Sequence, residues 1–353
     1  MDDAQSACVR WPVKRPIITR VATAYPPYRV SQVDVGRHSP ALFERARHAE
    51  LLARASQIDE RAIALPLDEL RALGSIEERN RIYARLAPVL ALRAAEQIAE
   101  HPEAIDCVVT SSCTGYSVPG WNVSLARGLH MRDDVARVPI TEAGCAGGVV
   151  ALARVADFVS SRGRGAGMAV AAELCSLAFH SGGDASNYVA SLIFADGAGA
   201  ACVEMGSADG FEIVDALSEQ IPKTEGLLGF DLTDAGFYPV LSNELTDVLA
   251  AAMPSAVQRL LGRNGLARAD VAGWLLHPGG ARILARLESA LELCRAQTRW
   301  AWDSMRAHGN TSSASIFNVI ARALAEPASG NWHIAAAFGP GVSVELLLLR
   351  RIG

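Results

Sequence analysis

Two kinds of apolar pattern alternate along the chain. Strands are predicted by short apolar runs, many rich in β-branched residues, at residues 17–24, 107–109, 138–140, 168–174, 189–204, 211–217 and 272–276. Helices are predicted by apolar positions at helical spacing, at residues 40–64, 75–100, 144–159, 243–261 and 315–325. Two final runs, residues 333–338 and 343–350, predict a hairpin around Gly339-Pro340-Gly341. A polar loop is expected at residues 180–188.

The order of these elements repeats once. Residues 17–206 and residues 207–353 each run through strands and helices in a similar succession. No short tandem repeat and no low-complexity linker lies between them. We therefore predict two similar α/β halves that join near residues 207–210 and fold as one body. Residues 1–16 lack such a pattern and are expected to form a loose N-terminal arm.

Composition and charge narrow the class of protein. The chain has 353 residues, of which 50% are hydrophobic and 20% charged, so it can bury a large core. Its net charge of -5 gives no electrostatic reason to expect nucleic acid or an anionic membrane as partner. Residues 1–16 hold no apolar core of signal-peptide length, and the apolar stretch at 144–155 is too short to span a bilayer. We expect a soluble, cytoplasmic protein.

The seven cysteines are neither a disulfide framework nor a zinc site. Their number is odd, no CxxC pair occurs, and no cysteine–histidine cluster has zinc-ligand spacing. Free thiols in a reducing compartment, and no bound metal, are the expectation.

One cysteine has an unusual context. Cys145 follows Gly144 and precedes Gly147-Gly148 at the predicted start of a small-residue helix. The glycines suit a sharp turn from strand to helix, and a helix N-terminus favours thiolate over thiol. A free cysteine is more often a small buried hydrophobe. We interpret Cys145 as a nucleophile, and its glycine neighbours as close-packing positions and not as a phosphate loop.

A histidine and an asparagine have comparable contexts. His277 ends an apolar strand and precedes Pro278-Gly279-Gly280, where an imidazole could pair with a thiolate and later donate to an oxyanion. Asn310 lies just before a predicted helix and suits hydrogen-bond donation to a carbonyl or enolate oxygen. The plainer alternatives are a buried core histidine and a helix cap, and Asn310 could serve both purposes.

The order and contexts of Cys145, His277, Asn310 and Gly339-Pro340-Gly341 resemble the type III polyketide synthases, the chalcone-synthase-like branch of the thiolase superfamily. The resemblance covers roughly residues 17–351. It implies the five-layered αβαβα thiolase fold, in two pseudo-duplicated halves that each carry a mixed sheet, and a homodimer. Ketoacyl-ACP synthase III enzymes also use Cys, His and Asn. The His-Pro-Gly-Gly form and the Gly-Pro-Gly loop favour the polyketide branch.

The resemblance also implies a reaction. An acyl-CoA starter is transferred to Cys145, while His277 and Asn310 hold malonyl-CoA, promote its decarboxylation and stabilise the enolate. Claisen condensation and cyclisation then give a pyrone or a phenolic product, with no metal or redox cofactor beyond the CoA thioesters. Two alternatives stay open: a ketoacyl-ACP synthase III-like enzyme that condenses once, and a non-catalytic thiolase-fold protein.

Further site residues are implied by position. Phe194 matches one gatekeeper phenylalanine, and Pro239 stands where the second is usual, so that Phe237 or Tyr238 could replace it. Phe230 is expected to narrow the cavity and Ala178 to widen it, while Cys113 is either a second cavity cysteine or a buried structural thiol. Val118 matches a position that reaches into the partner subunit. Other expected substrate-binding positions are Thr114, Gly279, Ser312 and Gly341. Basic residues for the CoA phosphates are expected among Arg45, Arg47, His48, Arg54 and Arg61.

Overall fold

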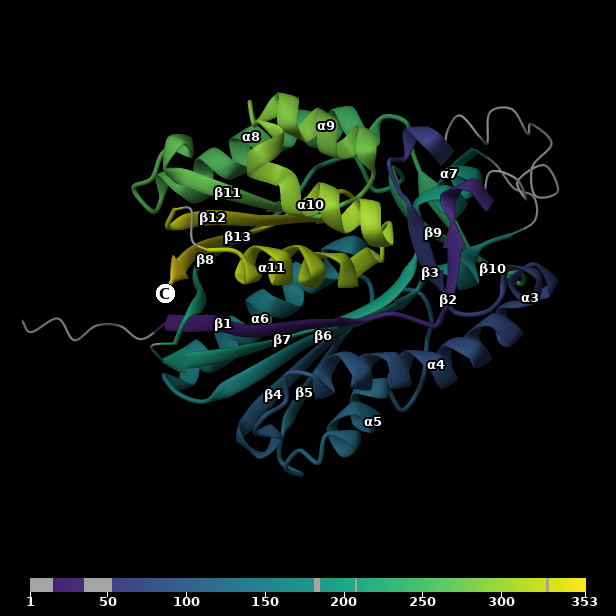
Figure 1. Ribbon diagram of the computed structural model, residues 1–353, viewed down its shortest axis with the longest axis horizontal. Helices are drawn as coiled ribbons and strands as arrows, with labels where there is room; N and C mark the ends of the chain where they lie inside the picture. The colour runs from purple at the N-terminus through teal and green to yellow at the C-terminus, as the bar shows by residue number, and fades with distance from the viewer. Residues whose placement is uncertain (1–14, 35–52, 181–184, 207, 328–329) are drawn as a thin grey trace, which may run out of the picture.

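The computed structural model describes residues 15–34, 53–180, 185–206, 208–327 and 330–353. Its described strands form one nine-stranded sheet and two small two-stranded sheets (Figure 1). The expected N-terminal arm lies almost wholly outside these residues, apart from Arg15 and Pro16, which open the first strand. The division into two halves at residues 206 and 207 stays a prediction.

The N-terminal part of the large sheet is mixed. Its strands lie in the order β5 (Ala136–Ile140), β4 (Ile105–Ser111), β6 (Ala166–Leu174), β7 (Asp196–Gly206) and β1 (Arg15–Ala24). Strands β4, β5 and β6 run parallel, whereas β7 runs antiparallel to both β6 and β1. Alanine, valine and cysteine fill β6 and β7 because both faces of these strands are covered.

The C-terminal part repeats this arrangement with four strands. They lie in the order β8 (Gly210–Gln220), β13 (Ser343–Ile352), β12 (Trp332–Gly339) and β11 (Val271–Leu276). The predicted hairpin is thus β12–β13, which pairs from Trp332 with Arg350 to Gly339 with Ser343. The two parts, which we expected to carry separate sheets, join where Ile17 and Ile18 of β1 pair with β8.

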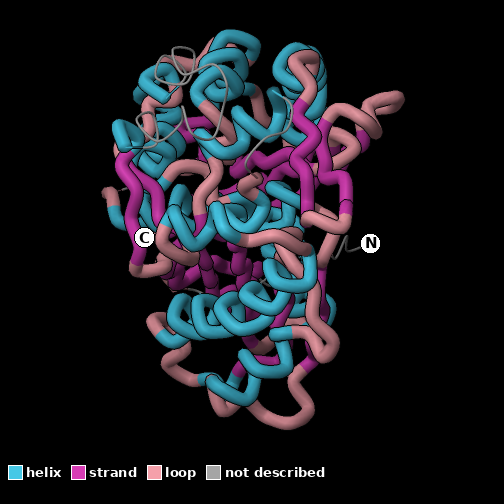
Figure 2. Tube along the Cα trace, turned by 90° about the vertical axis from the view of Figure 1, so that its right-hand side faces the viewer, coloured by secondary structure: helices cyan, strands magenta, loops and turns pink. Residues whose placement is uncertain are grey.

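Helices complete a five-layered arrangement (Figures 1 and 2). Between the two parts of the sheet lie α6 (Gly147–Arg162) and α11 (Ser315–Ala325). The outer face of the N-terminal part is covered by α4 (Ile76–Glu96), with α5 (Trp121–Gly128) beside it. The outer face of the C-terminal part is covered by α8 (Leu245–Gly262), α9 (Ala281–Ala290) and α10 (Arg295–His308). These layers match the predicted thiolase-like αβαβα order.

Small residues let the central helices approach each other. A Cβ atom added at Gly147 would lie 2.0 Å from Ser111 Oγ, and one added at Gly148 would lie 2.3 Å from the Ser313 carbonyl oxygen. The glycines after Cys145 are therefore close-packing positions. The helical stretch Gly144–Arg162 is long and apolar enough to cross a membrane, but its apolar side chains are buried between the sheets.

Three predictions of local structure were wrong. Residues 189–193, expected as strand, belong to α7 (Ala185–Ile193), and the expected loop at 180–188 is helical from Ala185. Residues 60–63, expected as helix, form β3 (Glu60–Ile63), which pairs with β2 (Tyr28–Ser31). Residues 40–52 of that expected helix lie outside the described residues.

Elements outside the predicted set complete the chain around the site. They are the hairpin of β9 (Leu228–Thr233) and β10 (Gly236–Leu241), the helix α3 (Leu67–Ala72), and the short 3-10 turns η2 (Gly144–Ala146), η3 (Cys175–Ala178) and η5 (Ser312–Ala314).

Candidate active site

Cys145 lies in the η2 turn, directly before α6. Gly144 takes φ +51°, a conformation that favours glycine, and a Cβ atom there would lie 2.5 Å from Pro340 Cδ. A Cβ atom at Gly339 would lie 2.5 Å from the Ala143 carbonyl oxygen. The Gly-Pro-Gly loop between β12 and β13 therefore packs directly on the turn that carries Cys145, and both signatures need their small residues for this contact.

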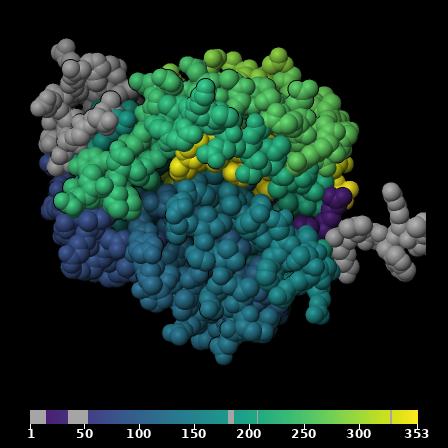
Figure 3. All heavy atoms as spheres, turned by 180° about the vertical axis from the view of Figure 1, so that it is seen from behind, coloured from purple at the N-terminus to yellow at the C-terminus, as the bar shows by residue number. Residues whose placement is uncertain are grey.

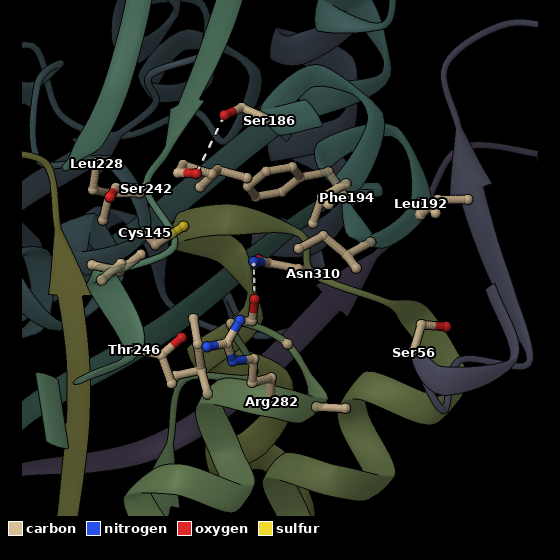
Figure 4. Close-up of a pocket in the computed structure, with 18 of the residues that line it drawn as sticks. Ser56, Cys145, Ser186, Leu192, Phe194, Leu228, Ser242, Thr246, Arg282 and Asn310 are labelled. Atoms are coloured by element: carbon tan, nitrogen blue, oxygen red, sulfur yellow. Dashed lines mark hydrogen bonds between the residues drawn. The ribbon is translucent and has the colours of Figure 1, made fainter. Parts of the chain in front are cut away.

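Asn310 is fixed by its backbone next to Phe194. Asn310 N–H donates to the Ile193 carbonyl at 2.9 Å, and Ala195 N–H donates to the Asn310 carbonyl at 2.8 Å. Its side-chain Oδ1 accepts the Ser312 N–H at 2.8 Å, which is the cap-like contact expected at a helix start. The amide Nδ2 is left to face the pocket, where its hydrogen bond to the Gly279 carbonyl is long, at 3.5 Å (Figure 4). Asn310 thus presents an N–H donor.

His277 follows the last residue of β11. Its backbone N–H donates to the Ala336 carbonyl at 2.7 Å, and its ring lies edge-on to Phe338 at 5.4 Å between centroids. The side chain is completely buried, yet within the described residues neither ring nitrogen has a hydrogen-bond partner. A buried polar group without a partner is rare, so these nitrogens are available to a group that enters the pocket.

One pocket of about 390 Å³ contains all three groups. Cys145, His277 and Asn310 all line it, and the Cys145 thiol and the Asn310 amide face a common space beside the Phe194 ring (Figure 4). The walls are mostly apolar and include Val189, Leu192, Ile193, Leu228, Leu241, Leu245, Ile283 and Phe338. Ser56 and Ala55 line it as well, so the pocket reaches from the β2–β3 region to the nucleophile turn.

A second, smaller chamber lies beyond Cys145. It has a volume of about 30 Å³ and shares Cys145, Phe194, Leu228 and Leu241 with the larger pocket. Its other walls are Cys113, Gly144, Cys175, Gly229, Phe230, Pro239, Ser312 and Pro340. The expected narrowing by Phe230 agrees with this placement, and the β9–β10 hairpin forms one wall of the chamber. Phe194 stands at the border of the two spaces.

Burial controls the charge states of the two reactive groups. It raises the pKa of the Cys145 thiol to about 12, and it lowers the pKa of the His277 imidazole to about 3. Both shifts favour the uncharged form, because a charge loses its hydration in the protein interior. The ion pair that we expected at rest is therefore disfavoured. A thiolate at Cys145 would need an imidazolium in direct contact to compensate it.

Cys113 belongs to the same polar cluster as Cys145. The Ser312 hydroxyl oxygen lies 3.6 Å from each of the two sulfur atoms. Burial and the carboxylate of Glu173 raise the pKa of the Cys113 thiol well above its usual value. Cys113 thus lines the small chamber with a partly exposed side chain, and a role for its thiol in the reaction stays a prediction.

Glu173 is a buried carboxyl group that sequence reasoning missed. It is completely buried and accepts hydrogen bonds from the Cys113 N–H at 3.1 Å, from Thr114 Oγ1 at 2.8 Å and from Ser313 Oγ. Burial raises its pKa. A signal was present in the sequence, because Glu173 is the one charged residue in the apolar run of 168–174.

Of the remaining residues expected to bind substrate, some line one of the two spaces and others line neither. Gly279 lines the large pocket, and Phe230, Pro239 and Ser312 line the small chamber. Neither space is lined by Ala178, Thr114 or Gly341. Ala178 is buried in η3, the Thr114 hydroxyl donates to Glu173, and Gly341 N–H donates to the Leu228 carbonyl, so each acts on the cavity through a neighbour.

The expected phosphate-binding arginines require a correction. Arg61 is buried in β3 and donates to the carbonyls of Ser191 and Phe194, so it cannot reach a phosphate outside the pocket. Arg54 is exposed and precedes Ala55 at the pocket. Arg45, Arg47 and His48 lie outside the described residues. A basic residue that we missed, Arg282, is exposed in the first turn of α9 and lines the pocket (Figure 4).

Val118 lies on the surface, away from both chambers of its own chain. It is 79% exposed, and Tyr116 beside it is 64% exposed. Both residues border a separate hollow of about 430 Å³ that also includes Trp121 and Ile140.

Comparison with known families agrees with this geometry. The family model for the N-terminal domain of chalcone and stilbene synthases matches residues 64–208, and the model for their C-terminal domain matches residues 212–353. The chain belongs to this family. It is a type III polyketide synthase, an acyltransferase of the condensing class, and the single-condensation alternative is not supported.

Individual relatives span nearly the whole chain. A 1,3,6,8-tetrahydroxynaphthalene synthase from Streptomyces peucetius subsp. caesius is 33% identical over 348 residues, covering 94% of this chain and 92% of the relative. The phloroglucinol synthase of Pseudomonas fluorescens is 27% identical and covers 91% of this chain and 95% of its own length. The solved type III polyketide synthase domain of Steely1 from Dictyostelium superposes with a TM-score of 0.89 at 26% identity, covering 96% of this chain and 100% of that domain.

Proposed function

We propose that this polyketide synthase loads an acyl group from an acyl-CoA onto Cys145 and extends it with malonyl-CoA, and that the chain then cyclises to a pyrone or a phenolic product. One observation carries the proposal most directly. A half-buried thiol, a buried imidazole without a hydrogen-bond partner among the described residues, and an amide N–H donor line one mostly apolar pocket. Acyl transfer between thioesters needs these three kinds of group.

In the loading step, Cys145 attacks the thioester carbonyl of the starter. The thiol proton passes to His277 as the carbon–sulfur bond forms, and His277 returns it to the departing CoA sulfur. Because burial disfavours both charges, proton transfer is coupled to substrate binding and is not completed beforehand. The imidazole and the Asn310 amide donate to the thioester oxygen while it carries negative charge.

In the extension step, malonyl-CoA takes the place of the departed CoA. Its carboxylate leaves as carbon dioxide, and the electron pair moves into an enolate whose oxygen is held by His277 and Asn310. The enolate carbon attacks the acyl group on Cys145, the bond to sulfur breaks, and the lengthened chain remains on CoA. No oxidant, reductant or metal takes part in this sequence. Within the described residues, no group of three or more His, Cys, Asp or Glu side chains is placed to hold a metal.

The substrates and the assembly are part of the proposal. Arg282, with Arg54, offers guanidinium groups for the CoA phosphates at the pocket. We propose a cytoplasmic homodimer in which Val118 contacts the partner subunit, supported by its exposed apolar side chain and by the family resemblance.

The decisive experiment is incubation of the purified protein with labelled malonyl-CoA, with and without a panel of acyl-CoAs, followed by mass spectrometry of products and intact protein. Polyketide products with an acyl adduct on the Cys145 peptide are expected. Cys145→Ala should abolish both without unfolding the protein, whereas Cys294→Ala, at an exposed thiol, should change neither.

The outcomes separate the alternatives. Product from malonyl-CoA alone would indicate a naphthol or phloroglucinol synthase, the activities named for two relatives. Polyketide formation by the Cys145→Ala variant would refute the role of Cys145. A protein that forms neither product nor adduct with any CoA thioester would contradict the proposed function.

A further inference from the structure

Arg61 is a buried cation that donates hydrogen bonds to backbone carbonyls and also interacts electrostatically with the completely buried carboxyl group of Asp196. Its side chain is 1% exposed, and its Nη1 donates to the Ser191 carbonyl at 2.8 Å and to the Phe194 carbonyl at 2.5 Å. Burial lowers its pKa to about 10, so the guanidinium stays charged at neutral pH. Burying a charge is costly unless the charge is paired and hydrogen-bonded, so its position near the cavity calls for an explanation.

Both carbonyls lie at the C-terminal end of α7. A third carbonyl there, that of Leu192, accepts a hydrogen bond from Gln32 Nε2 at 2.8 Å, and Gln32 is also buried. Gln32 follows β2, and Arg61 lies in β3, so the small two-stranded sheet of β2 and β3 supplies both donors. A positive charge is favourable at a helix C-terminus, where carbonyls lack intrahelical partners. Arg61 and Gln32 together are called here the α7 clamp.

The α7 clamp holds the backbone at Phe194, the residue that lines both chambers. Phe194 lines the 390 Å³ pocket and the 30 Å³ chamber, and its neighbour Ile193 accepts the Asn310 backbone N–H. The Arg61 side chain also needs Gly309, where a Cβ atom would lie 2.9 Å from Arg61 Cγ. The glycine at position 309, next to Asn310, thus leaves the space that the aliphatic part of the Arg61 side chain occupies.

We propose that Arg61, assisted by Gln32, is a positioning residue that fixes the Phe194 ring beside Cys145, where the two spaces meet, and so sets how large a group can pass that ring to reach the thiol. The idea extends the proposed function, because the passage would admit acyl groups. It does not require turnover, since the passage also limits any reagent that reaches the Cys145 sulfur.

The test compares alkylation of Cys145 by iodoacetamide and by its bulkier N-benzyl derivative, scored by mass spectrometry on the Cys145 peptide. The ratio of the bulky to the small rate constant measures the width of the passage. In Arg61→Lys the shorter side chain places its ammonium nitrogen short of the Nη1 position that serves both carbonyls, so Phe194 gains freedom. We expect the ratio to rise about tenfold, the lower end of the effect of losing one hydrogen bond to a charged group.

Arg79 provides a matched control. It is also buried, and it donates to the carbonyls of Leu177, Phe179 and Leu73, but not to α7. Arg79→Lys should lower the melting temperature to a similar extent and leave the ratio unchanged. In a Phe194→Ala background, where the passage is already open, Arg61→Lys should add no further rise.

Three results would overturn the proposal. They are an unchanged ratio in folded Arg61→Lys, an equal rise in Arg79→Lys, and a rise in the Phe194→Ala background as large as in the parent. If Arg61→Lys fails to fold, Gln32→Leu tests the other half of the clamp. We then expect the ratio of rate constants to rise about twofold. An unchanged ratio in Gln32→Leu would also contradict the proposal. Because product formation is not measured, these results are independent of whether the proposed condensation occurs.

Discussion

At the scale of single residues, the proposed hydrogen-bond donors His277 and Asn310 differ in how the fold leaves their nitrogen atoms available to a substrate oxygen. His277 is buried with both ring nitrogens unpartnered among the described residues, whereas Asn310 is locked by its own Oδ1, which accepts the Ser312 N–H. Locking one end of the amide orients the other end as a donor. We therefore assign the enolate of malonyl-CoA mainly to Asn310, and proton transfer to His277.

Removing this amide should separate the two half-reactions. In Asn310→Ala we expect decarboxylation of malonyl-CoA to fall about a hundredfold, the usual effect of losing one oxyanion donor, while acylation of Cys145 persists. Release of labelled carbon dioxide measures the first, and intact mass the second. Asn318→Ala is the control, because Asn318 contacts Tyr25 and Arg322 instead of the pocket. Equal loss of both steps would refute the role of Asn310.

A histidine outside the site should give the protein part of its sensitivity to acid. His333 packs against Phe211 and Trp300, and burial lowers its pKa to about 4. An unfolded chain binds the proton near about pH 6.5, so between that pH and about pH 4 the unfolded state binds more protons and stability falls as pH falls. His333→Leu removes this penalty.

The expected result is a pH-dependent difference in the free energy of unfolding. At about pH 8 the variant should be less stable than the parent, because packing is lost, and at about pH 4.5 this deficit should shrink by about 2.5 kcal/mol. Urea unfolding at the two pH values measures both. The same deficit at both would show that His333 is protonated in the folded protein.

At the scale of elements, many of the regular helices and strands were predicted from the sequence, whereas the helices α5, α9 and α10 and the cavity walls were not. Residues 315–325 were predicted as the helix that α11 forms, because Ile316, Phe317, Val319 and Ile320 lie on its buried face at helical spacing. Residues 189–193 were taken for strand because a short apolar run containing Val189 and Ile193 fits either state. The α7 clamp, in which Arg61 and Gln32 donate to carbonyls at the end of this segment, stabilises its helical end at Ile193. These contacts join distant parts of the chain, so a local sequence pattern could not show them.

The turn before α6 allows a matched pair of substitutions. Gly144 and Gly163 both take a positive φ, of +51° and +63°, so alanine at either costs about 1–2 kcal/mol of backbone strain. At Gly144 the new Cβ atom would also meet Pro340, whereas at Gly163 nothing lies within 4 Å. Gly144→Ala should therefore abolish acylation of Cys145 and destabilise the fold more than Gly163→Ala, which should keep full activity. Thermal unfolding and intact mass after acyl-CoA treatment test this, and equal behaviour would contradict it.

At the scale of the whole molecule, the N-terminal and C-terminal parts of the chain lie on opposite sides of the central helices, and both contribute residues to the pocket. The blue and teal part faces the green part in Figure 3, with yellow C-terminal residues between them. Cys145, His277 and Asn310, which line one pocket, could be singled out from the sequence because each lies beside its own glycines, and their roles stay a prediction. Glu173, Arg61 and the chamber volumes were not, since they depend on how distant segments pack.

The exposed face around Val118 should determine the assembly. Val118→Glu should weaken the proposed homodimer, because it places a charge where an apolar contact is expected. Leu232→Glu is the control, as Leu232 is 66% exposed on the β9–β10 hairpin and is not part of that face. Light scattering after size-exclusion chromatography gives the mass. A monomeric parent, or equal dissociation of both variants, would count against this interface.

The contact of Gly339 and Pro340 with the turn at Gly144 also has a consequence for the order in which the site forms during synthesis. A ribosome makes Cys145 long before it makes the loop that supports it, and the described strand β13, which follows that loop, lies between β8 and β12 inside the sheet. While the chain is being made, the Cys145 thiol lacks this support, and the turn that carries it is completed only after β12 and β13 have been made and paired. The proposed nucleophile would therefore gain its surroundings late in folding.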